Sequence, residues 1–386
     1  MYSPIGDGAA QVARARFEAR IAGGRESGQA IIERIMTEVP TDAIVRGSGI
    51  AVDGNIIDRG VGSFAGMLVD MPTEYKGEAQ LECSDWALQQ ICSRNDVPWK
   101  YAQFLLQQDR LDWGGPVLAN CLNESLGHDK KKKRYLTREY GGELRGFLSD
   151  RYRRMDSRPL VEAFANSCQE VGALPINGWG NQTKVGLTAV LPDLYEPAPN
   201  EVLSFGVTWQ NSDYGNGKHD ISAFVDRPWC ANGMIMSLGF AQIHLGKRLD
   251  ESLIISDKTH ELDTATQASA IKDVVRAALN QEAVQTMCQV VHDANEKEID
   301  VKAAIKGLKK QLTKGEAEMV TEKFNSPDVE MLPPGNTAWR LSNAISWVAG
   351  NQVDDAERKN DMQKLAGTVV ATALGLTAVR AARRRS

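Results

Sequence analysis

One stretch near the middle of the chain, residues 201–248, constrains the fold more than any other part of the sequence. In its first part apolar side chains alternate with small or polar ones, and the apolar set is Leu203, Phe205, Val207 and Trp209. A period of two is typical of a half-buried β-strand, because successive side chains of a strand point to opposite faces. Residues 211–217 (Asn-Ser-Asp-Tyr-Gly-Asn-Gly) then predict a turn, and residues 221–225 return from it. The stretch therefore predicts a β-hairpin at the centre of an antiparallel sheet.

Similar patterns elsewhere predict an α+β fold, with an antiparallel twisted sheet flanked by helices. The expected strands are residues 144–152, 184–191, 202–209, 221–225 and 234–243. Helical spacing of apolar residues predicts helices before and after this sheet, the longest at residues 263–292. We expect residues 1–43 to form an exposed helical or partly disordered arm and residues 44–350 a single core domain. Residues 351–386 are expected to form a C-terminal helix with a basic tail.

Composition limits the class of protein. The chain has 386 residues, 42% of them hydrophobic, which is enough to bury a substantial core. Its six cysteines form no Cys-x-x-Cys pair, so we expect reduced, buried thiols rather than a metal finger. No leader pattern opens the sequence and no apolar run approaches the roughly 18 residues of a membrane span. These features predict a cytoplasmic protein without a membrane partner.

Positive charge is concentrated in one segment, residues 130–158, which we call the basic segment. It holds eleven Lys or Arg and four Asp or Glu, a net charge of +7 in a chain whose formal net charge is −5. Read as a strand, it places Arg145, Phe147, Arg151 and Arg153 on one face. Cations for phosphates and an aromatic face for bases are what single-stranded nucleic acid requires. The candidate binding residues are Lys130, Lys131, Lys132, Lys133, Arg134, Arg138, Arg145, Phe147, Arg151, Arg153 and Arg154. The alternative is that these charges pair with carboxylates of the same chain.

The predicted turn offers a second candidate site, because His219 and Asp220 follow it and Asp213 lies inside it. Together these three residues would suit a metal-dependent or acid/base hydrolase. Neither Glu-x-x-His nor His-x-x-x-His occurs, so we favour a structural turn with solvated residues 218–220. Its expected structural residues are Asn211, Asp213, Gly215, Gly217, Arg227, Cys230, Asn232 and Gly233, with a tight turn at the last two. No nucleotide-loop pattern is complete, and no cofactor or metal is expected.

Several short motifs carry a family resemblance. They are Leu148-Ser149-Asp150-Arg151-Tyr152 with Arg153-Arg154-Met155-Asp156, Asn211-Ser212-Asp213, Cys230-Ala231-Asn232-Gly233, His244-Leu245-Gly246, and Asn336-Thr337-Ala338-Trp339 with Asn343-Ala344. In this order they resemble the phage/plasmid-like protein family, a domain of unknown function from mobile elements, over roughly residues 83–350. The resemblance implies a protein that accompanies replication or recombination genes, in the cytoplasm of the host cell.

Three functions follow as expectations. The first is a non-catalytic accessory of phage or plasmid DNA metabolism that binds single-stranded nucleic acid and assists annealing. Its expected sheet is similar, by fold-level analogy alone, to annealing proteins of the Red-beta class. The second is a structural or host-interaction protein that self-associates through the apolar segment at residues 365–379. The third and weakest is the hydrolase at Asp213, His219 and Asp220.

Overall fold

The alternating stretch forms the hairpin that it predicts. Strand β10 (Glu201–Asn211) pairs with β11 (Asp220–Arg227) in an antiparallel register that sets Val207 opposite Ala223 and Trp209 opposite Ile221. The computed structural model describes residues 1–5, 11–57, 66–73, 75–128, 133–228, 232–236, 257–308, 310–326 and 332–376. Phe205, Val207 and Trp209 are fully buried as expected, but Ser204 and Thr208 on the other face are buried too, so the strand is not half-buried.

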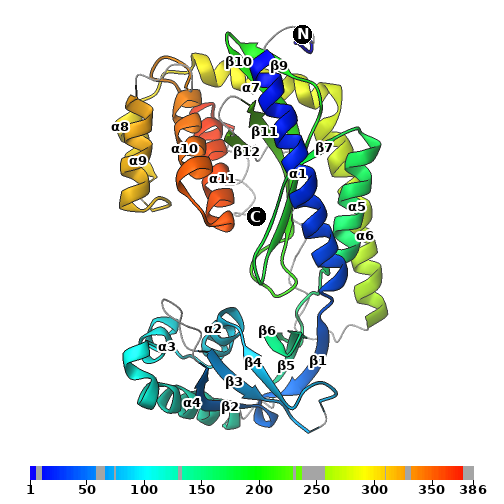
Figure 1. Ribbon diagram of the computed structural model, residues 1–386, viewed down its shortest axis with the longest axis vertical. Coiled ribbons are helices and arrows are strands. Elements are labelled where there is room, and N and C mark those ends of the chain that lie inside the picture. Colours follow the sequence, from blue (N-terminus) through cyan, green and yellow to red (C-terminus); the bar gives the residue numbers. More distant parts are fainter. Residues whose placement is uncertain are drawn as a thin grey trace, which may run out of the picture.

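This hairpin lies at the centre of one of the two six-stranded sheets in the described residues (Figure 1). The strand order is β12-β11-β10-β8-β7, and β9 also pairs with β10. The other strands are β7 (Leu174–Gly180), β8 (Val185–Val190), β9 (Tyr195–Ala198) and β12 (Asn232–Met236). The α+β class is therefore confirmed. Residues 237–243, the expected end of the last strand, lie outside the described residues.

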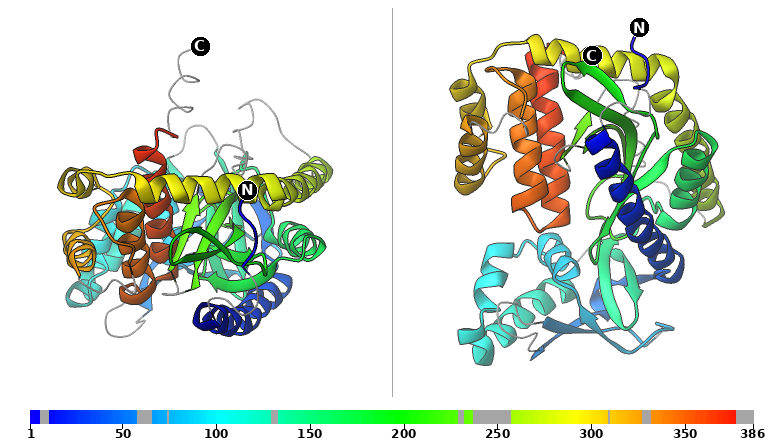
Figure 2. Two further views of the ribbon diagram at one scale, coloured as in Figure 1. Left: turned by 90° about the horizontal axis from the view of Figure 1, so that it is seen from above. Right: turned by 45° about the horizontal axis from the view of Figure 1, so that its top comes forward.

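Helices surround this sheet and form with it what we call the large lobe. Apolar side chains of the sheet share one large buried cluster with the helices listed next. They are α5 (Ser157–Glu170), α6 (Asp257–Leu279), α7 (Gln281–Glu296), α10 (Ala338–Gln352) and α11 (Ala356–Ala373). Two shorter helices, α8 (Val301–Gly307) and α9 (Lys314–Asn325), lie beside α10 (Figures 1 and 2). None of the described helices is long and apolar enough to cross a membrane.

The second sheet belongs to a small lobe, residues 41–149, with a core of its own. Its strands are β1 (Thr41–Arg46), β2 (Ala51–Ile57), β3 (Gly66–Asp70), β4 (Gln80–Cys83), β5 (Arg134–Tyr140) and β6 (Glu143–Ser149). The order is β1-β5-β6-β4-β3-β2, and β4 and β6 run parallel. Its helices are α2 (Asp85–Arg94), α3 (Trp99–Leu105) and α4 (Leu111–Gly127), with single turns at Gly47–Gly49 and Gln108–Arg110.

Residues 144–152 were expected to join the same sheet as the central hairpin, and this expectation is wrong. Strand β6 pairs with β5 instead, across a turn at Gly141 and Gly142, whose φ angles are +61° and +78°. Two successive residues with positive φ favour a tight hairpin, and glycine adopts that conformation without steric strain. Residues 134–149 therefore pair locally rather than with residues 184–191. Strand β6 also ends at Ser149, so Arg151 and Arg153 do not share a strand face with Arg145.

The N-terminal segment is not the exposed arm that was expected. Helix α1 (Gln11–Thr37) lies along the large sheet, and its buried residues include Phe17 and Ile21 (Figure 1). It touches β7 backbone to backbone, because a Cβ added at Gly24 would overlap the backbone of Ile176. At Gly178 of β7 a Cβ would likewise overlap the carbonyl of Ser27. Small residues in α1 allow this contact. A sequence pattern of large apolar residues does not predict it, because the contact depends on glycine.

The C-terminal stripe also differs from its expected role in self-association. Helix α11 buries its apolar residues against α10 and the edge strand β12 of the same chain, including Ala366, Val369 and Val370. Gly367 lies against the carbonyl of Ile235 so closely that a Cβ would overlap it. The stripe is therefore covered within the protein as far as Val370, whereas Leu376 is 45% exposed. The basic tail, residues 377–386, lies outside the described residues.

We expect Gly24→Ala to destabilise the protein by about 3 kcal/mol, because the new methyl group must displace strand backbone. Gly23→Ala is the matched control, since a Cβ at Gly23 meets nothing within 4 Å. There alanine should raise the free energy of unfolding by about 0.5–1 kcal/mol through its higher helix propensity. Urea unfolding of both variants measures the difference. Equal stabilities would show that α1 does not contact β7 closely.

Candidate functional site

Most described arginines of the basic segment are bound to carboxylates of the same chain. Arg145 pairs with Glu143 at 2.8 Å and with Glu38 at 2.9 Å. Arg153 pairs with Asp263 of α6, and Arg154 with Asp42 at 3.2 Å. Their side chains are at most about a quarter exposed. Lys130, Lys131 and Lys132 lie outside the described residues.

Phe147 does not present a ring for a nucleic-acid base. Its side chain is fully buried in the core of the small lobe and stacks on Tyr135, with ring centroids 4.4 Å apart. The predicted period of two does not hold along β6, because the register shifts at Arg145 and both Leu144 and Phe147 lie in the core with helices α2 to α4. The proposed binding face of that strand is therefore part of a core.

Arg138 is the most deeply placed of these cations. It is 1% exposed and makes contacts of 2.6 Å with Asp42, with Asp156 and with the backbone carbonyl of Asp213. Burial alone would lower the pKa of the Arg138 guanidinium, but Asp156 and Asp42 raise it above its ordinary value. Arg138 is therefore charged, and it joins β1 and β5 of the small lobe to the large lobe.

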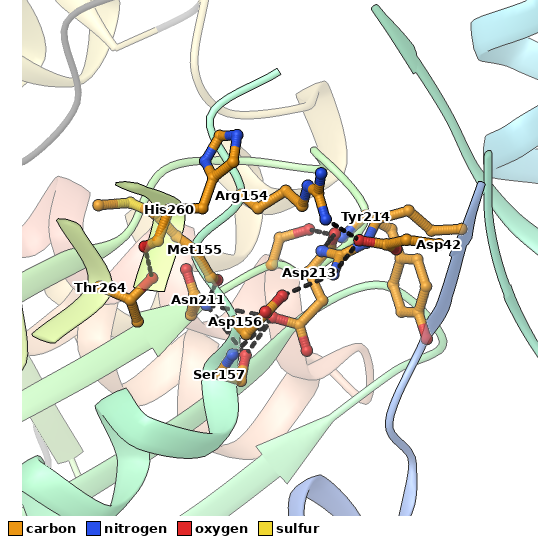
Figure 3. Close-up of polar contacts among 12 residues, drawn as sticks. Asp42, Arg154, Met155, Asp156, Ser157, Asn211, Asp213, Tyr214, His260 and Thr264 are labelled. Atoms are coloured by element: carbon orange, nitrogen blue, oxygen red, sulfur yellow. Dashed lines mark hydrogen bonds and ion pairs between the residues drawn. The ribbon is translucent and has the colours of Figure 1, made fainter. Parts of the chain in front are cut away.

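The central hairpin turn supplies the other half of this contact. The Asp213 carboxylate accepts hydrogen bonds of 2.8 Å from the backbone N–H and the hydroxyl of Ser157, the first residue of α5. A carboxylate in this position satisfies an N–H that the helix itself leaves without a partner. The Asn211 amide donates to the Met155 carbonyl at 2.7 Å and to the Ser157 hydroxyl at 2.9 Å. Figure 3 shows these side chains converging around the start of α5.

The backbone of the same turn binds the small lobe. The Tyr214 carbonyl accepts hydrogen bonds from the Trp86 indole at 2.9 Å and from the Gln90 amide at 3.0 Å, both on α2. We call this contact region the lobe joint. Its residues are Asp42, Trp86, Gln90, Arg138, Arg154, Asp156, Ser157, Asn211, Asp213 and Tyr214.

The structure forms the predicted turn at residues 211–217. Gly215 and Gly217 have φ angles of +74° and +128°, values that L side chains rarely adopt. The Ser212 hydroxyl accepts from the backbone N–H of Asn216 at 2.8 Å, which closes the turn. Asp213 and Tyr214 also line a small hollow, with Arg34, Asn181 and Lys184 on its other walls. The bracing role predicted for Asn211 and Asp213 is confirmed.

His219 and Asp220 are buried, which corrects the expectation that they are solvated. The Trp209 indole donates to His219 Nε2 at 2.9 Å, so the neutral ring carries its proton on Nδ1. Burial lowers the pKa of His219 to about 4, although Asp220 opposes this shift. Asp220 faces Lys364 of α11 at 3.4 Å, whereas Asp213 faces α5. The structure thus directs the three residues of the hydrolase hypothesis to different partners. In the described part of the chain, no group of three or more His, Cys, Asp or Glu is placed to hold a metal.

The remaining turn residues have other roles. Arg227 forms a buried pair with Glu201 at 2.7 and 2.8 Å, and the Trp339 indole donates to the same carboxylate at 2.8 Å. Asn232 and Gly233 begin strand β12 and do not form the expected tight turn. The reason is packing, because Gly233 leaves room for the Phe224 ring, which a Cβ would overlap. Cys230 lies outside the described residues. Of the other cysteines four are buried as expected, but Cys121 is exposed.

One group of cations does reach the surface, at the end of the small sheet. Arg46 of β1 is the direct register partner of Arg134 of β5, and both are exposed. Lys133 precedes Arg134, and Arg151 follows the end of the neighbouring strand β6. We call these four residues the positive edge. Asp150 contacts Arg134 at 3.4 Å, and Arg46 has no ion pair to another described residue. The sequence did not indicate Arg46, because only the strand register brings it beside the basic segment.

Comparison with known proteins does not add a family to this picture. No family model, no curated protein and no solved structure matches the chain.

We expect Arg138→Ala to lower the free energy of unfolding by about 3–5 kcal/mol, because it leaves two carboxylates without their buried partner. The matched control is Arg134→Ala on the same strand, whose side chain is 44% exposed. An exposed pair of this kind contributes about 0–1 kcal/mol. Thermal and urea unfolding of both variants measures the difference. If the two variants melt alike, Arg138 does not hold the lobes together.

Asp213 should make stability depend on pH in an unusual direction. Burial raises its pKa to about 6, while Arg138 and the hydrogen bonds from Ser157 lower it. A raised carboxyl pKa means that the folded state binds the proton more readily, so this group stabilises the fold increasingly as pH falls from about 6 to about 4. Asp213→Asn removes that proton equilibrium and keeps the shape. The free energy of unfolding of the wild type, relative to that of the variant, should therefore increase as the pH falls from about 6 to about 4. A relative stability that instead increases toward pH 7 would show that Arg138 dominates.

Proposed function

We propose that the protein binds single-stranded nucleic acid through the positive edge of its small lobe. The observation that carries the proposal is the pair Arg46 and Arg134. Directly opposite residues of an antiparallel pair share a face, with Cα atoms about 5 Å apart, and like charges there are destabilising. An anion bound between them removes that repulsion. A phosphate is such an anion, and Arg binds phosphate oxygens with two parallel hydrogen bonds.

The charges around the positive edge support a polyanion rather than a single small anion. Lys133 and Arg151 extend the row along the ends of β5 and β6, and residues 130–132 add three lysines next to it in sequence. Within this row Asp150 contacts Arg134 at 3.4 Å. A local excess of cations in an otherwise acidic chain concentrates anions near that surface. This proposal moves binding from the strand face expected at Arg145 and Arg153 to the sheet end, since those two arginines are paired internally.

A role in strand annealing during phage or plasmid DNA metabolism, in the host cytoplasm, extends this proposal and rests on the sequence resemblance. It requires no catalytic centre. The structural or host-interaction function is less favoured, because four residues of the stripe expected to mediate self-association are buried within the same chain, namely Leu365, Ala366, Val369 and Val370. The hydrolase is less favoured because Asp213, His219 and Asp220 have separate partners.

The test is oligonucleotide binding by the double variant Arg46→Glu with Lys133→Glu. Affinity for a labelled oligothymidylate should fall at least tenfold at low salt, and the salt dependence should become shallower because fewer counterions are released. The melting temperature should stay near that of the wild type, since both side chains are exposed.

The matched control changes the same charge elsewhere, with Lys302→Glu and Lys306→Glu on the exposed face of α8. This variant should bind like the wild type. If both double variants weaken binding equally, net charge rather than the positive edge is responsible. If the wild type does not bind at any salt concentration, the proposed function is wrong.

A further inference from the structure

Three aromatic side chains of the small lobe lie on the surface side by side. Tyr101, Phe104 and Trp113 are 44%, 42% and 45% exposed. Tyr101 and Phe104 stand three residues apart on one face of α3, with ring centroids 6.3 Å apart and planes inclined by 13°. Trp113, at the start of α4, meets Phe104 edge to face at 6.5 Å. We call these three residues the aromatic patch.

The core of the lobe does not need these rings. The buried residues of α3 are Ala102 and Leu105 on an adjacent face, and the rings are absent from the buried clusters. The two helices are held together at Gly114, where a Cβ would overlap the carbonyl of Leu105. This contact fixes Phe104 beside Trp113. A rigid, contiguous set of exposed aromatic rings marks an interaction surface rather than incidental exposure.

The charges near the aromatic patch indicate what it binds. Arg110 lies over the Phe104 ring at 3.8 Å, and Lys100 is exposed next to Tyr101. Asp109 and Asp112 offset these two cations, so the patch has no excess charge for phosphates. Its rings and the stacked guanidinium are instead surfaces for flat, uncharged groups. Nucleic-acid bases are such groups, and they stack on aromatic rings without regard to sequence.

Helix α4 connects the aromatic patch to the positive edge. Trp113 lies at its start, and Leu126 near its end contacts the segment at Gly47 that follows Arg46. At about 1.5 Å per residue its 17 residues span roughly 25 Å. A strand of a few nucleotides covers this length, since binding sites for single strands commonly take about 4–16 nucleotides.

We propose that the aromatic patch is a base-stacking platform for the same single-stranded nucleic acid whose phosphates lie on the positive edge. This inference rests on the proposed function and assigns a separate site to the bases. Base stacking involves no charged group of the nucleic acid. The two sites therefore differ in a measurable way, because only the positive edge should change the salt dependence.

The experiment measures the affinity of the full chain for a labelled oligothymidylate at several salt concentrations. Phe104→Ala and Trp113→Ala should each weaken binding about tenfold, the usual effect of removing one stacking ring. The slope against salt should stay that of the wild type. Trp113→Phe keeps a ring and should recover most of the affinity. Leu262→Ala, at an apolar position on α6 that is 61% exposed, is the control and should have no effect.

The outcomes separate the two proposals. If Arg46→Glu with Lys133→Glu weakens binding but the aromatic variants bind normally, the base-stacking proposal is wrong. Phosphate binding at the positive edge is then supported. If the aromatic variants change the slope against salt, they act on phosphate contacts and the platform is also wrong. If the wild type binds no oligonucleotide, both proposals fail, and a fall in particle mass on Trp113→Ala would identify the patch as a protein interface.

Discussion

The arrangement of the two lobes depends on the charge of one buried side chain, Arg138. Its guanidinium binds Asp42, Asp156 and a carbonyl of the central turn, so three separate chain segments meet on it. Burying a cation is unfavourable unless its donors all find acceptors, and here the acceptors come from both lobes. The joint therefore favours this relative position of the lobes, because moving either lobe would remove acceptors from the Arg138 guanidinium. The hairpin turn adds directed bonds to α2 and α5.

Local patterns in the sequence predicted the elements whose structure depends on neighbouring residues. The alternation at residues 203–209 identified the central strand, and the Asn-, Asp- and Gly-rich run identified its turn. The β5–β6 hairpin was not predicted, because Gly141-Gly142 was not identified as a turn between two strands. Helix α1 was missed as a core element because its contact surface includes Gly24 and Gly28, whose importance lies in close approach rather than in apolar area.

The candidate site was harder to predict, because charges find their partners across long stretches of sequence. Arg138 and Asp42 are 96 positions apart, and Arg153 and Asp263 are 110 apart. No spacing rule indicates which cations are paired internally and which reach solvent. The basic segment has an unusual excess of positive charge, but most of its described arginines form ion pairs within the chain. Of the exposed positions that matter for the two proposals, Lys133, Arg134 and Arg151 lie in that segment, whereas Arg46 and the aromatic patch lie outside it.

The small lobe interrupts the large one in sequence. Helix α1 precedes residues 41–149 and the rest of the large lobe follows them, so the chain leaves the large lobe and returns to it. During synthesis α1 emerges first but cannot dock until β7, about 140 residues later, has been made. The small lobe, with its complete core, can fold in the meantime. Helix α1 therefore has to wait for β7, and the face that it later buries has to stay soluble until then.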